Sequence, residues 1–344
     1  MQVSVVILNW NGKNYLQQFL PILLEKTRLS YVEIVVADNG STDGSLQLLK
    51  EQFPMVRIIL FDKNYGFAEG YNKALSQIKS DYYVLLNSDV EVTDNWLLPL
   101  VDYMEKHPQT AACQPKILSY FNRTHFEYAG AAGGFIDYLG FAFCRGRIFG
   151  EVEEDKGQYD DPMNVFWTSG ACMMVRAGLY HKMGGFDADF FAHMEEIDLC
   201  WRFNSRGYQL TCVPESMVYH IGGGTLQSEH PFKTYLNFRN NLLMLYKNLP
   251  KKQLKSVFFK RAILDYLAVF QFLASAKPKN ARSILKARSD FRKMKPNFLD
   301  KRKENILFST ATSFPMIYPR SIVVDYYLRK KKKFSQLKFA VKEN

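Results

Sequence analysis

Hydrophobic runs of strand length alternate with segments of helical periodicity along the first part of the chain. The strand-like runs cover residues 3–8, 32–37, 56–61 and 82–86, and the helical segments 14–25, 43–52 and 67–78 lie between them. This β-α-β-α-β-α-β order is typical of a mostly parallel sheet with helices packed on both faces. We therefore expect an α/β protein with a Rossmann-like core.

Polar loops follow each of the four strands. In an open parallel sheet, ligands bind beyond the carboxyl ends of the strands, so these loops should meet at one binding edge. They occupy residues 9–12, 38–44, 62–66 and 87–89 and are rich in carboxylates and amides. A tight turn with Ser41 or Thr42 capping the next helix would account for 38–44 alone, but not for the shared chemistry of all four loops.

Two nucleotide-binding signatures are missing from these loops. The G-x-G-x-x-G of dinucleotide-binding proteins should open the first helix, where this chain has N-W-N-G-K-N, and the P-loop pattern is absent as well. A ligand at this edge would then be held by carboxylates and amides, which suit ribose hydroxyls, base edges and a divalent cation.

Four segments carry a resemblance to a known family. V-S-V-V-I-L-N-W-N-G, V-V-A-D-N-G-S-T-D-G-S, N-Y-G-F-A-E-G-Y-N and L-L-N-S-D-V resemble family-2 glycosyltransferases of the GT-A fold, and most closely their rhamnosyltransferase-like bacterial branch. The similarity extends over about residues 3–246. It implies a nucleotide-sugar donor at the binding edge, contacted by Asn9, Asn11, Asp38, Asn64, Gly66, Gly70, Asn72, Asn87, Ser88 and Asp89.

The resemblance also implies a metal site at the end of the fourth strand. Asp89 is similar to the last residue of the family's D-x-D motif, which holds Mg²⁺ or Mn²⁺ against the donor diphosphate, whereas the first acidic position is Asn87 here. One carboxylate suffices for such a cation, because Mg²⁺ is often bound through one or two carboxylates together with substrate phosphates. His220, in V-Y-H-I-G-G-G-T, is the second expected ligand, and the glycines 222–224 after it suit a flap over phosphate oxygens. A solvated aspartate at a strand end is the competing interpretation of Asp89.

The stretch E-E-I-D-L-C-W-R begins a helix expected over residues 195–206. It resembles the family's E-D-x-D-L-C-x-R motif, whose second acidic residue is the catalytic base, so that Glu196 is the base here and Glu195 the second candidate. Asp198, the third catalytic candidate, is expected to pair with Arg202 at i,i+4, whereas Glu196 lies about 200° away around the helix. A structural interpretation, in which Glu195 and Glu196 only favour the helix dipole, stays open.

The charge distribution predicts two regions. The resemblance implies that residues 1–246 form the GT-A domain, with a donor-nucleotide half (1–118) and an acceptor and catalytic half (119–246). Its last helix resembles the family's closing helix, in which Tyr235, Arg239 and Asn240 are expected to contact donor or acceptor. Residues 247–344 hold 25 basic and 6 acidic residues and have helical periodicity. This basic helical C-terminal region suits an anionic membrane surface, although a solvated surface or contacts in a homo-oligomer would also explain it.

Cysteine usage and the apolar segments bear on location. The five cysteines include no C-x-x-C pair, and no secretory signal is evident, so we expect a cytoplasmic protein, peripheral on the inner face of the cell membrane. The longest apolar stretch outside the core, 266–276, is about half of the roughly 20 residues that a spanning helix needs.

The predicted function is transfer of a sugar from dTDP-rhamnose or a UDP-sugar to a glycan or lipid-diphosphate-linked acceptor in bacterial surface polysaccharide synthesis. Inversion at the anomeric carbon follows from the resemblance, and a retaining enzyme would use the same residue types. The alternative is a protein without turnover that binds nucleotide sugars or nucleic acid. Because no nucleic-acid-binding motif occurs in the chain, we expect no nucleic-acid partner.

Overall fold

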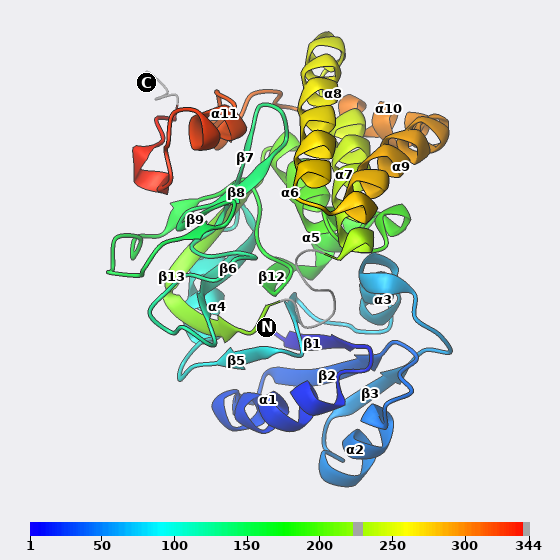
Figure 1. The fold of residues 1–344 in the computed structure, drawn as a ribbon. Helices are drawn as coiled ribbons and strands as arrows, with labels where there is room; N and C mark the ends of the chain where they lie inside the picture. The colour runs from blue at the N-terminus through cyan, green and yellow to red at the C-terminus, as the bar shows by residue number, and fades with distance from the viewer. Residues whose placement is uncertain (223–229, 340–344) are drawn as a thin grey trace.

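The computed structural model describes residues 1–222 and 230–339. Its centre is a nine-stranded sheet with the order β11-β13-β6-β12-β4-β1-β2-β3, in which β5 also pairs with β13 (Figure 1). A smaller five-stranded sheet has the order β10-β9-β8-β7-β14. The expected α/β architecture is confirmed.

The first half of the large sheet follows the predicted alternation. The elements are β1 (Val3–Asn9), α1 (Lys13–Lys26), β2 (Val32–Asp38), α2 (Ser45–Gln52), β3 (Arg57–Leu60), α3 (Gly66–Leu75) and β4 (Tyr82–Leu86). Strands β4, β1, β2 and β3 are all parallel to their neighbours. Strand β1 is almost wholly apolar and buried because helices cover both faces of the sheet.

The second half of the large sheet is mixed. It comprises β5 (Val90–Val92), α4 (Leu98–Lys106), β6 (Thr110–Ser119), β11 (Met163–Asn164), β12 (Cys172–Arg176), α5 (Ala177–Lys182), α6 (Glu195–Ser205) and β13 (Gln209–His220). Strand β12 lies antiparallel between β4 and β6, whereas β6 and β13 are parallel. The carboxyl ends of β4 and β13 therefore carry the residues that follow them to the same region as β1 and β2.

Two hydrophobic cores lie on opposite faces of the large sheet. Side chains of β1 alternate between them: Val5 packs in the core formed with α1, α2 and α4, whereas Val6 packs with α3, α5, α6 and α7 (Pro231–Asn248). This alternation is the period-two pattern of a strand buried on both sides.

The smaller sheet joins the middle of the chain to its end. Strands β7 (Gly134–Asp137), β8 (Ala142–Cys144), β9 (Arg147–Ile148) and β10 (Glu151–Val152) come from the middle, and β14 (Ile317–Tyr318) pairs with β7. The C-terminal region is helical, as expected, with α8 (Lys251–Ala274), α9 (Pro278–Met294), α10 (Leu299–Leu307) and α11 (Ile322–Tyr327). The division of the chain at residue 246 stays a prediction, and this position lies inside α7.

In Figure 1, α8, α9 and α10 gather at one end of the molecule, away from α1 and α2, and α11 lies apart from them, beyond β7. Within the described ranges, every helix is too short or too polar to cross a bilayer.

Candidate active site

The loops after β1 and β2 are tied together at the binding edge. Asn9 is fully buried, and its amide donates to Asp38 Oδ2 at 2.9 Å and to Ser41 Oγ at 3.1 Å. The backbone N–H of Thr42 donates to Asn11 Oδ1 at 2.8 Å. Three of the predicted donor residues are thus brought together, and Asp38 is held in place by Asn9 and by the N–H of Ser41.

Asn64 and Gly66 form the entrance to α3. Asn64 Oδ1 accepts from the N–H of Gly66 at 2.7 Å and from the Asn39 amide at 3.1 Å. Gly66 has a φ of +79°, and a Cβ there would lie 2.5 Å from the ring of Phe191, so the position requires glycine. The loop after β3 is therefore packed directly against the segment that precedes α6.

The other two predicted donor residues of α3 have packing roles. A Cβ on Gly70 would lie 2.8 Å from Leu8 and 3.1 Å from the Asn39 amide, so glycine lets α3 approach β1. Asn72 accepts from Tyr180 and from the N–H of Phe186 and donates to the carbonyl of Phe186 at 2.8 Å. Asn72 thus anchors the chain leading to the predicted catalytic residues.

The end of β4 forms a second polar group with the end of β13. His220 Nε2 lies 3.1 Å from Asp89 Oδ1 and 3.4 Å from the amide of Asn87, and its Nδ1 lies 3.3 Å from Glu127 Oε2. Burial opposes protonation of His220, but the carboxylates of Asp89 and Glu127 raise its pKa to about 10. Ser88, the remaining predicted residue, lies close to the loop after β1, because a Cβ on Gly12 would be 3.3 Å from its Oγ.

The side chains at the ends of β4 and β13 suit a divalent cation whose coordination shell is completed by the phosphates of a bound substrate. No cluster of three or more His, Cys, Asp or Glu side chains able to hold a metal occurs in residues 1–222 and 230–339. Asp89 supplies one carboxylate, and His220 would supply an imidazole nitrogen once its Nε2 proton is lost to the arriving cation. Glu127 at Nδ1 is placed as carboxylates commonly are behind metal-binding histidines. These residues fit a Mg²⁺ or Mn²⁺ ion whose other ligands are phosphate oxygens and water.

Glu195 and Glu196 begin α6. Burial raises the pKa of Glu195 well above its usual value, and the neighbouring Glu196 adds to this effect. Burial also raises the pKa of Glu196 to about 7. The Oε2 atoms of both side chains are buried and have no hydrogen-bond partner in the described part of the chain. A carboxylate with a pKa near neutrality is suited to proton transfer.

The chain reaches α6 through an unusual backbone. Phe191, His193 and Met194 have φ angles of +66°, +70° and +74°, a conformation that residues other than glycine seldom adopt. The amide of Asn240, on α7, donates to the carbonyls of Phe190, Ala192 and His193 at 2.9, 2.9 and 2.8 Å. Asn240 is fully buried, so its amide supports the loop and is not presented to a substrate.

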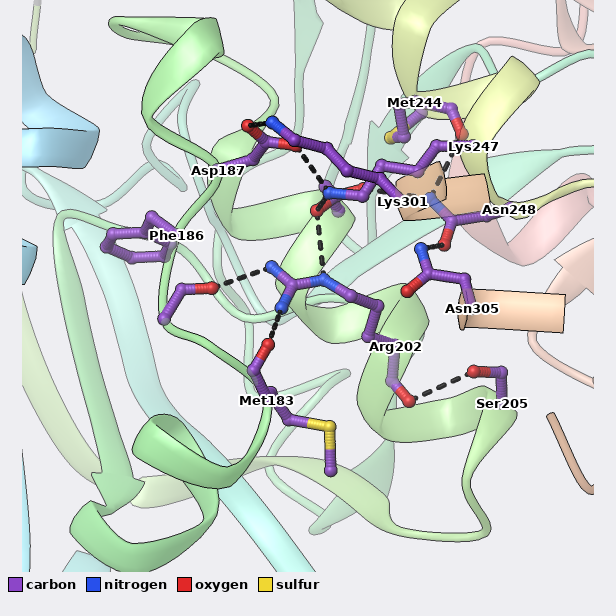
Figure 2. Close-up of polar contacts among 12 residues, drawn as sticks. Met183, Phe186, Asp187, Arg202, Ser205, Met244, Lys247, Asn248, Lys301 and Asn305 are labelled. Carbon is purple, nitrogen blue, oxygen red and sulfur yellow. Dashed lines mark hydrogen bonds and ion pairs between the residues drawn. The ribbon is translucent and has the colours of Figure 1, made fainter. Parts of the chain in front are cut away.

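Asp198 is fully buried in an ionic network with Arg202 and Lys247. Figure 2 labels both of these basic partners. The expected pair with Arg202 is present, with Nε 3.0 Å from Asp198 Oδ2. Lys247 Nζ and the Asn248 amide, both from α7, are 2.8 Å from its two oxygens. Arg202 also donates to the carbonyls of Met183 and Gly185, so the network fixes α6 to the loop that precedes it.

The same network extends to the C-terminal region. Asp187 accepts from Lys247 at 2.7 Å and from Lys301 of α10 at 2.6 Å (Figure 2). Burial opposes ionisation of Asp187, but Lys247 and Lys301 lower its pKa to about 2. Two basic residues of the C-terminal region, the buried Lys247 and the partly exposed Lys301, thus neutralise a buried carboxylate.

The Cys144 thiol on β8 interacts electrostatically with two carboxylates of the candidate site, Glu127 and Glu196. Burial raises the pKa of the Cys144 thiol; Arg147 opposes this shift, while the carboxylates of Glu127 and Glu196 add to it. The thiol is therefore within electrostatic reach of Glu127, the partner of His220, and of Glu196.

Comparison with known proteins identifies the family of the chain. The model of the family "Glycosyl transferase family 2" matches residues 4–184, more than half of the chain. The chain belongs to glycosyl transferase family 2. This family-2 glycosyltransferase is 27% identical to an N-acetylglucosaminyl-diphospho-decaprenol L-rhamnosyltransferase of Mycobacterium tuberculosis, over 63% of this chain and 75% of the relative. It is also 23% identical to the rhamnosyltransferase WbbL of Escherichia coli, over 74% of this chain and 95% of the relative.

Solved structures share the GT-A fold of this family-2 glycosyltransferase. TarS (residues 1–349) of S. aureus in complex with UDP-GlcNAc matches with a TM-score of 0.56 at 14% identity, over 97% of this chain and 93% of that one. The mannosyltransferase PcManGT of Pyrobaculum calidifontis, in complex with GDP-Man and Mn²⁺, matches with a TM-score of 0.52 at 14% identity, over 89% and 84%. The family, the fold class and the enzyme class predicted from the sequence are confirmed.

Some residues of this site were not predicted. Glu127 comes from a segment without clear periodicity, and only its contact with His220 places it in the site. Asn240 was expected to contact a substrate, and its use in the loop could be known only from the packing of α7. Of the predicted glycine flap, residues 222–224, Gly222 is among the residues that the structure describes, and residues 223 and 224 lie outside the described residues.

Proposed function

We propose that this chain is an inverting glycosyltransferase that moves a sugar from dTDP-rhamnose or a UDP-sugar to a hydroxyl of a lipid-diphosphate-linked glycan in bacterial surface polysaccharide synthesis. Two rhamnosyltransferases among its relatives support the donor, and the Mycobacterium tuberculosis relative is named for a lipid-diphosphate-linked acceptor. Such an acceptor would place the enzyme at the cytoplasmic face of the membrane.

The observation that carries this proposal is that the Glu196 carboxyl is buried at the start of α6 and has a raised pKa. Its Oε2 is buried and unpartnered within the described ranges, and the pKa of its carboxyl is about 7. The carboxylate takes the proton of the acceptor hydroxyl, whose oxygen forms a bond to the anomeric carbon of the donor. The bond from that carbon to the phosphate oxygen breaks, and its electron pair leaves with the nucleoside diphosphate. Glu195 is the second candidate for the base.

The donor would lie along the loops after β1, β2 and β4. Asp38, which Asn9 holds in place, would accept hydrogen bonds from the ribose or the base. Beside it, Asn11 joins the loop after β1 to Thr42 in the loop after β2. Asp89 and His220 would hold the divalent cation, with Asn87 beside them. When bound, this cation would offset the negative charge on the departing diphosphate. Asp198 acts as a positioning residue that holds α6 in place.

A screen of nucleotide sugars tests the proposal. Purified protein is incubated with dTDP-rhamnose, UDP-sugars and GDP-mannose, with and without Mn²⁺, together with a synthetic lipid-diphosphate-linked N-acetylglucosamine. Release of nucleoside diphosphate that depends on both acceptor and cation is expected with one donor class. Failure of every donor to be consumed, while the same preparation binds nucleoside diphosphate, would favour a protein that binds nucleotide sugars without turnover.

A further inference from the structure

The outer face of α8 carries a continuous row of exposed hydrophobic side chains. Phe259, Ile263, Tyr266, Leu267, Phe270 and Leu273 are each between 43% and 68% exposed. At 100° per residue, their positions fall within an arc of about 120° on one side of the helix. Isolated exposed hydrophobic residues are ordinary, but a row of six over four turns is a feature of interaction surfaces.

The inner face of the same helix is buried and mostly apolar, with the ion pair of Arg261 and Asp265 among its hydrophobic side chains. Val257 and Val269 are buried, and Val269 packs with Ala281 and Ile284 of α9 and with Phe238 of α7. A helix that is hydrophobic on both faces is normally covered on both sides. Here the described part of the chain covers only the inner side of α8, so the outer face is suited to a surface outside this chain.

The charges around the row are basic. Asp265 is the sole acidic residue from position 251 to position 289, and it is buried between Arg261 and Arg288. Exposed basic residues lie at both ends of the row, before it on α8 and after it on α9: Lys251, Lys252, Lys255, Lys279, Arg282 and Lys286. An apolar face flanked by lysine and arginine is the pattern of helices that lie in the interface of an anionic bilayer.

Aromatic side chains of α7 lie between α8 and the segment that precedes α6. Phe238 of α7 packs against the cluster of Val269, Ala281 and Ile284 beneath α8. Earlier on α7, the rings of Phe232 and Tyr235 are stacked. Phe232 in turn contacts Phe191, in the left-handed segment before Glu195. In Figure 1 the lower end of α8 lies near the start of α7 and above α3. We expect an acceptor held in a bilayer at this face to reach Glu196 along α7.

From these observations we propose that the outer face of α8 docks on an anionic phospholipid surface, with its hydrophobic row in the interfacial layer and the flanking basic residues at the headgroups. The proposal rests on the proposed function only in its account of the acceptor. A second copy of the chain is a less suitable occupant, because a twofold interface through α8 would bring two strongly basic regions together.

Flotation of the full-length protein with vesicles tests this docking. Wild-type protein is mixed with phosphatidylcholine vesicles, or with vesicles that also contain phosphatidylglycerol, at low salt and in about 1 M NaCl, where charges are screened beyond about 3 Å. Binding to the anionic vesicles at low salt is expected, with a loss of at least about tenfold in high salt or in the variant I263E/L267E/F270E. The matched control M55E/L60E changes two exposed residues of the donor-nucleotide half and should float like wild type.

The outcomes are separable. Equal flotation of the α8 variant and wild type would overturn the proposal, as would a wild type that binds neither vesicle type. If wild type fails to float but light scattering shows a dimer that the α8 variant converts to a monomer, the face is an interface between copies and the membrane proposal is wrong. Thermal stabilisation by nucleoside diphosphate and Mn²⁺, measured on the same samples, reports on the donor site alone.

Discussion

The amide of Asn240 lies 2.8 Å from the carbonyl oxygen of His193, across 47 residues of sequence. Because the same amide reaches two more carbonyls of the loop, one side chain of α7 holds the left-handed segment from which α6 begins. Backbone in this conformation costs free energy and persists only when its surroundings fix it. The direction in which Glu195 and Glu196 enter the site therefore depends on Asn240.

Replacing Asn240 with aspartate should lower kcat and leave donor binding nearly unchanged. Aspartate keeps the shape of the side chain but cannot donate to three carbonyls, and its charge repels them. A displacement of the loop by about 1 Å could reduce kcat by about 100-fold. Steady-state kinetics would measure kcat and KM for the donor. The control is N237D, the same change at a partly exposed position on α7. A rise in donor KM with unchanged kcat would instead place Asn240 at the donor.

Turnover should rise with pH through about 7. Burial raises the pKa of Glu196 to about 7, and only its ionised form accepts the acceptor proton. A pH profile of kcat/KM should therefore show a single ionisation near neutrality on its acidic limb. Glu196→Gln should lower kcat by several orders of magnitude with donor affinity retained, and E195Q serves as the comparison. Greater damage from E195Q would transfer the role of base to Glu195.

The same pKa predicts a change in stability. A carboxyl whose pKa is raised in the folded state stabilises the fold below its unfolded value, 4.5, and this contribution is lost as the pH rises through about 7. Glu196→Gln removes the ionisation, so the variant should melt at a higher temperature than wild type at pH 8 and at a similar temperature at pH 5. Melting curves at the two pH values measure this difference. A constant difference would show that the carboxyl is not desolvated.

The parts of the fold that the sequence predicts are those with strong local periodicity. The first four strands and three helices alternate as apolar runs and helical segments, and their polar loops fall at one edge because parallel strands end there. The pairing of Asp198 with Arg202 follows from helix geometry alone. These relationships involve residues that are near one another in the sequence or at equivalent ends of strands.

Contacts between distant irregular segments could not be predicted in this way. Glu127 reaches His220 from a stretch with no helical or strand period, so nothing in its neighbourhood marks it as a partner. Lys247 looks like one more member of a basic tail, yet it is buried between Asp187 and Asp198. Its role depends on the packing of α7 against α6, which arises only in the tertiary structure.

Asp89→Asn should abolish turnover supported by Mn²⁺ and leave the fold intact. The substitution removes the carboxylate of the proposed cation site but keeps a side chain able to pair with His220. Thermal stabilisation by nucleoside diphosphate should lose its dependence on Mn²⁺, and far-UV circular dichroism should be unchanged. Full Mn²⁺-dependent activity in this variant would remove Asp89 from the site.

Glu127→Gln should weaken Mn²⁺ binding without removing a ligand. Glu127 lies 3.3 Å from His220 Nδ1, where a carboxylate orients the imidazole and increases its basicity. Loss of such a partner typically costs about 10- to 100-fold in metal affinity. Titration of Mn²⁺ in the presence of nucleoside diphosphate measures the change. E33Q, on the surface beside Arg57, is the matched control and should bind Mn²⁺ like wild type.

Lys247→Met should destabilise the whole fold at neutral pH. Lys247 is 5% exposed and forms ion pairs with Asp187 and Asp198. Its removal therefore leaves part of the negative charge on these two buried carboxylates without a positive partner. Removing one partner of a buried ion pair costs about 3–5 kcal/mol of unfolding free energy, which urea denaturation can measure. Lys252→Met, at an exposed position in the first turn of α8, should change the unfolding free energy by less than about 0.5 kcal/mol.

The pH dependence of this cost follows from Asp187. Lys247 and Lys301 lower the pKa of Asp187 to about 2, so the stability that its ionised carboxylate contributes is present above the unfolded pKa of 3.8 and is lost as the pH falls through about 2. The difference between wild type and K247M should therefore be largest at neutral pH and shrink below about pH 4. An equal cost for both substitutions would mean that the C-terminal helices are not held to α6 through this network.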